Sequence, residues 1–244
     1  MQPYLFPYMG YWQLIANSDK FIFFDVVQYN KRSWMNRNRI LHPDQPDQFQ
    51  YIIAPISKHN NGTLIKDIVI NNDEKWKDKI LGQLTVYKKL KAPFYNDTIE
   101  LIQRILEQDY QSFLDLSVKS TKMICEHIGI DLKYDLASNI EFDRKMVKSP
   151  GDWALAICNK LEVKNYINPY GGYEIFDEKK YNDDGVDIKF LKSKLSPYKQ
   201  SWRKEFMVGL SIIDVLMFNS RESVVDILKN NFQIMVKKDL EGIH

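Results

Sequence analysis

The feature that most constrains the fold is a change in hydrophobic spacing along the chain. Up to about residue 72, apolar residues stand in short runs, such as KFIFFDVV (20–27) and QYIIAPI (50–56). From residue 73 to about residue 130 they recur every three or four positions, which is the spacing of amphipathic helices. Short apolar runs then return. Helical stretches that alternate with strand-like runs predict an α/β fold.

This spacing places the expected elements along the 244 residues of the chain. Strands are expected at 20–27, 33–41, 50–56, 66–72, 131–136, 165–169 and 186–192. Helices are expected at 10–18, at 149–162 and, as a closing pair, between residues 211 and 231. The chain is long enough for one domain, so we expect a single α/β domain over 1–244 with a Rossmann-like, mostly parallel sheet. The stretch 73–130 is expected to be a helical segment or insertion within it.

Several residues are suited to the ends of these helices. Asn96 or Asp97 is expected to cap the second helix of 73–130, and Gly129 to end the third. Ser149 and Pro150 lie where the cap and first turn of the helix at 149–162 belong.

Charge and cysteine content exclude several classes of protein. Lys and Arg number 34 against 32 Asp and Glu, a net charge of +2, whereas proteins that bind long nucleic acids usually carry a strong basic excess. We therefore expect no DNA partner, although a nucleotide-sized anion remains compatible. Cys125 and Cys158 form no CxxC pair and have no clustered histidines, so no metal site is expected.

The apolar start of the chain does not have the pattern of a signal peptide. It lacks a basic region, Pro3 and Pro7 interrupt the apolar run, and no small-residue cleavage site follows. No apolar run approaches the length of about 20 residues that spans a membrane. Together with the two scattered cysteines, this predicts a cytoplasmic protein without a membrane span.

The stretch QPYLFPYMGYW (2–12) is the first candidate for a ligand site. Its aromatic residues are equally suited to packing over a sheet as a rigid loop. Alternatively, the prolines fix the loop, Gly10 lets the backbone approach a ligand, and the following helix directs its N-terminus at an anion. The candidate binding residues here are Gln2, Tyr4, Gly10 and Tyr11.

A second candidate is the polar cluster in FFDVVQYNKRSWMNRNRI (23–40). For any single residue a solvated surface loop is the simpler explanation. As a group, however, Arg37 between two asparagines offers a planar fork and amide donors for a phosphate or carboxylate. Asp25 ends a predicted strand, where α/β folds place ligands, and as a carboxylate it suits a general base. The candidate binding residues are Gln28, Lys31, Asn36, Arg37 and Asn38.

Two later stretches complete the candidates. In NYINPYGGYEIF the pair Gly171 and Gly172 follows a predicted strand, and either forms a tight turn or lets the backbone approach a ligand, with Glu174 in support. It is neither a GxGxxG fingerprint nor a P-loop. Farther on, Tyr198 and Gln200 remain open candidates for binding. Ser211 and Asp214 have the spacing of a capping box, which gives them a structural role.

These stretches together resemble the WbqC-like family, whose pattern QPxYxPxxGY continues through D-x-V-Q to NRN. The corresponding residues are Gln2, Pro3, Tyr4, Pro7, Gly10, Tyr11, Asp25, Val26 or Val27, Gln28, Asn36, Arg37 and Asn38. Tyr4 departs slightly from the pattern, because it directly follows Pro3 and so stands one position before the family's tyrosine. The later NPYGGYEIF and LSIIDVLMFN also look like the family pattern, so the resemblance spans most of the chain. It implies a role in O-antigen or related surface polysaccharide biosynthesis, for which a glycine transferase activity has been proposed.

Two functions from different classes follow from these observations. In the first, an N-acyl or aminoacyl transferase holds a nucleotide-linked amino sugar, with the NRN segment on the diphosphate and aromatic side chains on the base or sugar. Asp25, or alternatively Glu174, orients or deprotonates the amine, and no covalent nucleophile is required. The second is a non-catalytic sugar-nucleotide-binding or assembly protein.

The sequence leaves the acyl donor open among acyl-CoA, an aminoacyl-tRNA and an amino acid with ATP. It also leaves open whether the chain forms a homo-oligomer.

Overall fold

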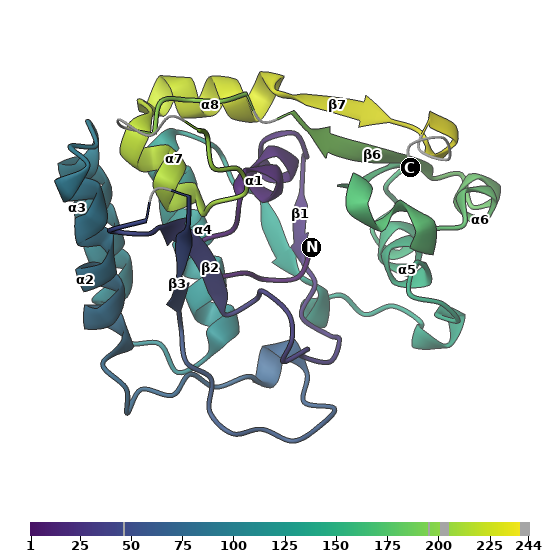
Figure 1. Ribbon diagram of the computed structural model, residues 1–244. Helices are drawn as coiled ribbons and strands as arrows, with labels where there is room; N and C mark the ends of the chain where they lie inside the picture. The colour runs from purple at the N-terminus through teal and green to yellow at the C-terminus, as the bar shows by residue number, and fades with distance from the viewer. Residues whose placement is uncertain (46, 195, 201–204, 240–244) are drawn as a thin grey trace.

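The computed structural model describes residues 1–45, 47–194, 196–200 and 205–239 (Figure 1). Its helices are α1 (Met9–Ala16), α2 (Trp76–Lys89), α3 (Tyr95–Leu106), α4 (Phe113–Ile128), α5 (Asp152–Lys160), α6 (Glu178–Asp183), α7 (Ile212–Phe218) and α8 (Arg221–Asn230). Its strands are β1 (Phe21–Phe23), β2 (Arg37–Leu41), β3 (Phe49–Ile53), β4 (Tyr134–Leu136), β5 (Asn165–Pro169), β6 (Asp187–Ser193) and β7 (Phe232–Met235). Short 3₁₀ turns are η1 (Ile65–Asp67), η2 (Ala137–Asn139), η3 (Arg144–Met146), η4 (Tyr170–Ile175) and η5 (Lys237–Asp239).

The helices predicted between residues 73 and 130 are confirmed as α2, α3 and α4. The ends of α4 follow directly from its sequence. The Ser112 hydroxyl accepts a hydrogen bond from the Asp115 backbone N–H at the start, and Gly129 ends the helix in the left-handed conformation with φ of 75°. Among the helices in the described part of the chain, none is long and apolar enough to cross a membrane.

The strands form three small sheets within the described residues. β1 pairs with β4 in parallel, β2 pairs with β3 antiparallel, and β6 lies between β5, parallel to it, and β7, antiparallel to it. The mixed α/β class is therefore confirmed. The predicted Rossmann-like, mostly parallel sheet is not established, because parallel and antiparallel pairs are equally represented and the pairs are distributed over separate sheets.

Three local predictions are corrected. Residues 66–72 were expected to be a strand, but they contain part of η1 and then only isolated bridges from Val69 to Ser112 and from Ile70 to Ile56, because no partner runs beside them for longer. Helix α3 has Phe94, not Asn96 or Asp97, at its cap position. Helix α5 begins at Asp152 after Gly151, so Ser149 and Pro150 precede it.

Helix α1 lies at the centre of the arrangement. All of its residues from Met9 to Ile15 are buried, and it packs against α8, β5 and β6. Figure 1 shows α2 and α3 on one side of it, and α5 and α6 on the opposite side. Most buried apolar side chains form one large core around α1 and α4, while a second core lies between α5, α6 and β6 and includes Cys158, Tyr181 and Phe190.

Candidate functional site

The opening stretch runs through the interior of the protein. Leu5 and Phe6 are fully buried, and the Leu5 backbone N–H donates to the Met35 carbonyl at 2.7 Å. The Asn38 side-chain amide donates to the carbonyls of Leu5 and Phe6 at 3.2 and 2.8 Å. The Ser211 hydroxyl donates to the same Phe6 carbonyl at 2.8 Å. The loop is thus bound both to β2 and to the residue that caps α7.

Phe6 adopts a backbone conformation that bulky residues rarely take. Its φ of 42° lies in the left-handed region. Such a conformation costs roughly 1–2 kcal/mol and persists only where the surroundings determine it. Here the buried ring and the bonds from Asn38 and Ser211 determine it. The next residue, Pro7, accepts further bonds from the Trp12 indole and the Ile212 backbone N–H, so the loop leaves the interior along a fixed path.

Tyr8 is the residue at which this loop reaches the surface, with 42% of its area exposed. Its ring lies against Gly10, where an added Cβ would come within 2.7 Å of a ring carbon. This packing accounts for Gly10 without a ligand at the backbone. The first turn of α1 has no side-chain cap and no acidic residue.

Tyr4, Tyr8 and Tyr170, called the tyrosine cluster below, lie where the opening loop faces η4. Burial raises the pKa of Tyr4, and the neighbouring Tyr8 phenol raises it further. Burial also raises the pKa of Tyr8, with an added electrostatic contribution from Tyr170. The Lys192 ammonium lies 5.3 Å from the centre of the Tyr170 ring. Helix α1, which follows the opening loop, also packs against β5, which precedes η4, so the two stretches expected to form one ligand site lie near each other.

The two glycines of η4 differ in their surroundings. A Cβ on Gly172 would lie 3.2 Å from the Asn168 side-chain amide, which is a tight contact. A Cβ on Gly171 would meet no atom within 4 Å, and Gly171 is not among the residues with positive φ. Neither packing nor backbone conformation explains a glycine at position 171. Glu174 is exposed in the same turn.

Contacts from the start of α5 hold η4 in place. An added Cβ on Gly151 would overlap the carbonyl oxygen of Ile175, so only glycine allows this close approach. The carbonyl of Gly151 accepts a hydrogen bond from the Tyr181 phenol at 2.7 Å. The end of η4 and helix α6 are thus both packed against residue 151.

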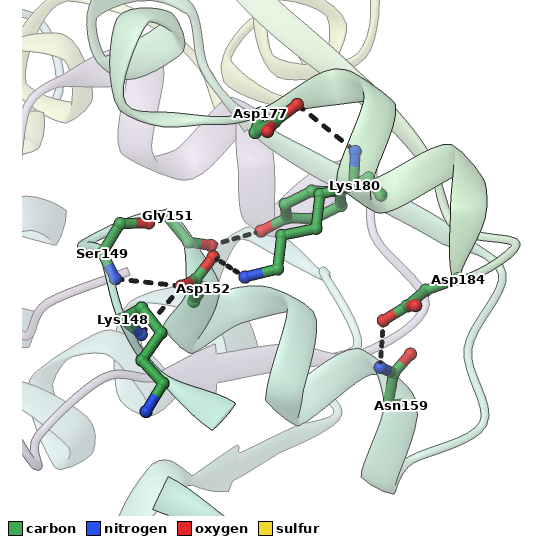
Figure 2. A network of polar contacts seen from close by, with 9 residues as sticks. Lys148, Ser149, Gly151, Asp152, Asn159, Asp177, Lys180 and Asp184 are labelled. Atoms are coloured by element: carbon green, nitrogen blue, oxygen red, sulfur yellow. Dashed lines mark hydrogen bonds and ion pairs between the residues drawn. The ribbon is translucent and has the colours of Figure 1, made fainter. Parts of the chain in front are cut away.

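Asp152 is the centre of the polar network shown in Figure 2. One carboxylate oxygen accepts hydrogen bonds from the backbone N–H groups of Lys148 and Ser149 at 2.8 and 2.9 Å. The other accepts from the Lys180 ammonium at 2.6 Å. Burial alone would raise the pKa of Asp152, but Lys180 and the two amides outweigh it and lower the pKa to about 2. Asp152 therefore joins the 148–152 turn to α6.

Asp25, the predicted base, is fully buried after β1. Its carboxylate accepts hydrogen bonds from the Ser138 backbone N–H at 2.9 Å and from the Ser138 hydroxyl at 2.6 Å. Its own carbonyl accepts from the Lys66 backbone N–H at 3.1 Å. This geometry favours a structural link between the segments that follow β1 and β4. Its role as a base stays a prediction.

The NRN segment does not form the combined site that its composition suggested. Side chains alternate between the two faces of a strand, and Asn36 and Asn38 lie on the opposite face from Arg37. The Asn36 amide accepts from the Tyr29 phenol and donates to the Ala54 carbonyl, and Asn38 is 6% exposed. Both asparagines are thus bound within the protein, while Arg37 points to the outer face of β2.

The remaining candidate binding residues in the first part of the chain also divide into buried residues and residues exposed to solvent. Tyr11 is 1% exposed, and its phenol donates to the backbone carbonyl of Gln2 at 3.1 Å, so it belongs to the core. Gln2 is half-buried beside it. Gln28 and Lys31 are exposed on the loop after β1, where Gln28 forms an isolated bridge with Leu64.

Tyr198 and Gln200 surround the buried carboxylate of Asp214. Asp214 accepts hydrogen bonds from the phenols of Tyr87 and Tyr198 at 2.9 and 2.5 Å, and from the Gln200 amide at 2.8 Å. Ser211 caps α7 as predicted, because its hydroxyl accepts from the Ile213 N–H. The Asp214 carboxylate does not complete the predicted capping box, because the Ser211 backbone N–H donates to the Arg39 carbonyl at 2.8 Å. It instead links α2 and the 198–200 segment to α7.

Three residues of the candidate site were not singled out by sequence reasoning. Tyr8 lies inside the opening stretch but outside the family pattern, and Tyr170 stands next to the paired glycines. Lys192 lies on β6, 22 positions after Tyr170, and only the pairing of β5 with β6 brings the two together. The density of tyrosines in the two stretches was the available signal.

The described residues contain no group of three or more His, Cys, Asp or Glu side chains placed to hold a metal ion. Both cysteines are buried free thiols. Burial raises the pKa of Cys125 to about 12 and that of Cys158 to about 11, so neither is an activated nucleophile.

Two substitutions of Asp25 test how much its hydrogen bonds to Ser138 contribute to the unfolding free energy. Asp25→Asn keeps an oxygen for the Ser138 N–H and an amide that can donate to the Ser138 hydroxyl, so we expect a loss of about 1 kcal/mol in unfolding free energy. Asp25→Ala leaves a buried N–H unpaired and is expected to cost about 2–3 kcal/mol. Urea denaturation measures both. Equal losses in the two variants would contradict this account.

Asp152 is expected to make stability depend on acid. Its folded pKa of about 2 lies below its ordinary 3.8, so its contribution is present above about pH 4 and is lost as the pH falls toward 2. Asp152→Asn should cost at most about 2 kcal/mol at pH 7, and less at pH 3, in urea denaturation. The control is Asp183→Asn, since Lys179–Asp183 has the same 2.6 Å separation at the surface. If the difference in unfolding free energy between the wild type and Asp152→Asn were the same at pH 7 and pH 3, the lowered pKa of Asp152 would be refuted.

Comparison with known proteins places the chain among relatives. A model of the WbqC-like protein family matches residues 2–226, a range that includes the whole tyrosine cluster. The chain is 26% identical over 225 residues to the uncharacterized protein Rv1507c of Mycobacterium tuberculosis (strain ATCC 25618 / H37Rv), covering 91% of this chain and 93% of that protein. No match was found among solved structures. The chain belongs to the WbqC-like protein family.

Proposed function

We propose that this chain is a cytoplasmic N-acyl or aminoacyl transferase of the glycyl type, acting on a nucleotide-linked amino sugar in surface polysaccharide biosynthesis. The observation that carries the proposal is the tyrosine cluster. Its members come from two loops that are distant in the sequence and interact electrostatically, and each loop presents a tyrosine with 42% of its area exposed. Exposed aromatic rings with a polar tip suit the apolar faces and hydroxyl groups of a sugar.

The acceptor would bind with its sugar against Tyr8 and Tyr170. Gly171 would let the ligand approach the backbone of η4, since the fold itself does not account for this glycine. The Lys192 ammonium beside the Tyr170 ring supplies a positive charge for the diphosphate of the acceptor. Phe6 has a strained backbone, and its carbonyl accepts two hydrogen bonds. These constraints would keep the opening loop rigid where it borders the site.

In the reaction, the amine nitrogen of the sugar attacks the carbonyl carbon of an activated acyl donor, such as acyl-CoA. A C–N amide bond forms, and the bond from the carbonyl carbon to the sulfur or oxygen of the carrier breaks. The proton of the amine passes to the Glu174 carboxylate, and the carrier leaves as a thiol or alcohol after taking up a proton. No enzyme nucleophile takes part, which agrees with the raised pKa values of the buried thiols.

Glu174 replaces Asp25 as the preferred base in this scheme. Glu174 is exposed on the same turn as Gly171, whereas Asp25 is fully buried and bonded to Ser138. We expect Glu174→Gln to lower turnover by about 100-fold with unchanged stability, and Asp25→Asn to retain most of it. The reverse result would return the role of base to Asp25.

The direct test incubates the protein with nucleotide-linked amino sugars and either acyl-CoA or activated glycine. Mass spectrometry of the sugar nucleotide should show the added acyl or glycyl mass. Isothermal titration of the same sugar nucleotides without donor is measured in parallel. If the sugar nucleotides bind but no acylated product forms with any donor, the proposed transferase activity is wrong.

Gly171 offers a specific prediction about acceptor binding. Because a Cβ at this position meets no protein atom, Gly171→Ala should leave the melting temperature unchanged and raise the Kd for the sugar nucleotide about tenfold or more. The matched control is Gly82→Ala, also without neighbours within 4 Å but on α2, which should leave the Kd unchanged. Equal affinity of the Gly171→Ala variant and the wild type would remove η4 from the site.

A non-catalytic sugar-nucleotide-binding or assembly protein is the second candidate. It is favoured by the engagement of the buried carboxylates of Asp25, Asp152 and Asp214 in hydrogen bonds within the fold. In that case the tyrosine cluster would bind the sugar nucleotide with the same dependence on Gly171, and Glu174→Gln would change nothing measurable.

A further inference from the structure

The outer face of the β2–β3 pair carries a second group of residues that the tyrosine cluster does not use. Arg37 and Arg39 project from this face of β2, since they alternate with the buried Asn38 and Ile40. The rings that surround them come from the turn before β2 and from β3. The group, called the basic-aromatic face below, consists of Trp34, Arg37, Arg39, Phe49 and Tyr51.

The rings hold both guanidinium groups in place. The Arg37 guanidinium lies 5.8 Å from the Trp34 ring centre and 5.4 Å from that of Tyr51. The Arg39 guanidinium lies 5.0 Å from the ring centres of both Trp34 and Phe49. Trp34 and Phe49 are nevertheless 42% and 37% exposed, so these rings also face solvent. Cations fixed in this way lose little freedom when they bind a ligand.

The two positive charges are not compensated by the part of the chain that the structure describes. Neither arginine forms an ion pair there, and the buried Nε atoms of both have no hydrogen-bond partner. Arg39 donates one bond, from Nη2 to the Gly209 carbonyl at 2.9 Å. Two like charges on one strand face repel, and buried donors without partners are rare in folded proteins. The uncompensated pair of like charges favours an anion from outside the chain, bound through the terminal guanidinium nitrogens.

We propose that the basic-aromatic face binds the diphosphate of a nucleoside diphosphate, with the base on the exposed Trp34 ring. Residues two apart on a strand are separated by about 7 Å, which suits two linked phosphate groups. Guanidinium forks bind phosphate oxygens, and aromatic faces stack on bases of any sequence. The site is distinct from the tyrosine cluster, because Asn38 binds the opening loop on the opposite face of β2.

The binding expected here does not depend on transferase activity. Isothermal titration is performed with uridine diphosphate, adenosine diphosphate, inorganic pyrophosphate and uridine. Both nucleoside diphosphates should bind, pyrophosphate should bind more weakly, and uridine should give no signal. Arg37→Gln and Arg39→Gln should each raise the Kd for the nucleoside diphosphates about tenfold or more. The control, Arg144→Gln in η3, removes an exposed arginine elsewhere and should leave the Kd unchanged.

Trp34→Leu separates stacking from charge. Since Trp34 is 42% exposed, this variant should fold normally, and circular dichroism checks this. It should raise the Kd for the nucleoside diphosphates about fivefold or more and the Kd for pyrophosphate by less, because both ligands lose the positioning of the guanidinium groups but only the nucleotides lose stacking. Binding that is insensitive to both Arg37→Gln and Trp34→Leu would overturn the proposal, as would the absence of nucleotide binding at millimolar concentration.

Gly171→Ala should not change the affinity for the nucleoside diphosphates. A loss of this affinity in Gly171→Ala would show that the basic-aromatic face and the tyrosine cluster are one site. If a short single-stranded RNA bound far more tightly than the nucleoside diphosphates, the assignment of a nucleoside diphosphate as the ligand would be wrong and RNA would be the better candidate.

Discussion

The carbonyl oxygen of Phe6 accepts hydrogen bonds from Asn38 and Ser211, and the arrangement of the first half of the fold depends on these two bonds. Asn38 belongs to β2, and Ser211 begins α7, more than 170 positions later in the chain. Through one peptide group the opening loop, a strand and a late helix are held together. The position of Tyr8, and hence its electrostatic interaction with Tyr170, is a consequence of this junction.

Local elements followed from the sequence to a large extent, because their determinants are local. The spacing of apolar residues predicted α2, α3 and α4, and the strand expected at 165–169 is β5 with the same bounds. Gly129 ended α4 as expected, since a left-handed residue at that point needs glycine. The pairing of strands was not predictable in this way. Parallel pairing of β1 with β4 joins residues more than 110 positions apart, and no local pattern encodes it.

The sequence predicted which stretches of the chain contribute to the candidate site better than it predicted the contacts of individual residues. The opening stretch and the Gly171–Gly172 stretch were both named, and they are neighbours. The structural contacts of Asp25 and Asn38 were not predicted, because their partners, Ser138 and the carbonyls of the opening loop, are distant in sequence. The separation of Arg37 from the flanking asparagines follows from strand alternation alone, so it was within reach of sequence reasoning.

Burial of the two thiols has a practical consequence for following the motions of this protein. Cys125 lies in the large core around α1 and α4, and Cys158, on α5, lies in the second core. A thiol reagent can modify either only when the surrounding core opens, and the raised pKa values keep background reaction slow. The labelling rate at each position therefore reports the opening free energy of its own core. The natural sequence thus carries two built-in probes, which show whether the two cores open together or separately.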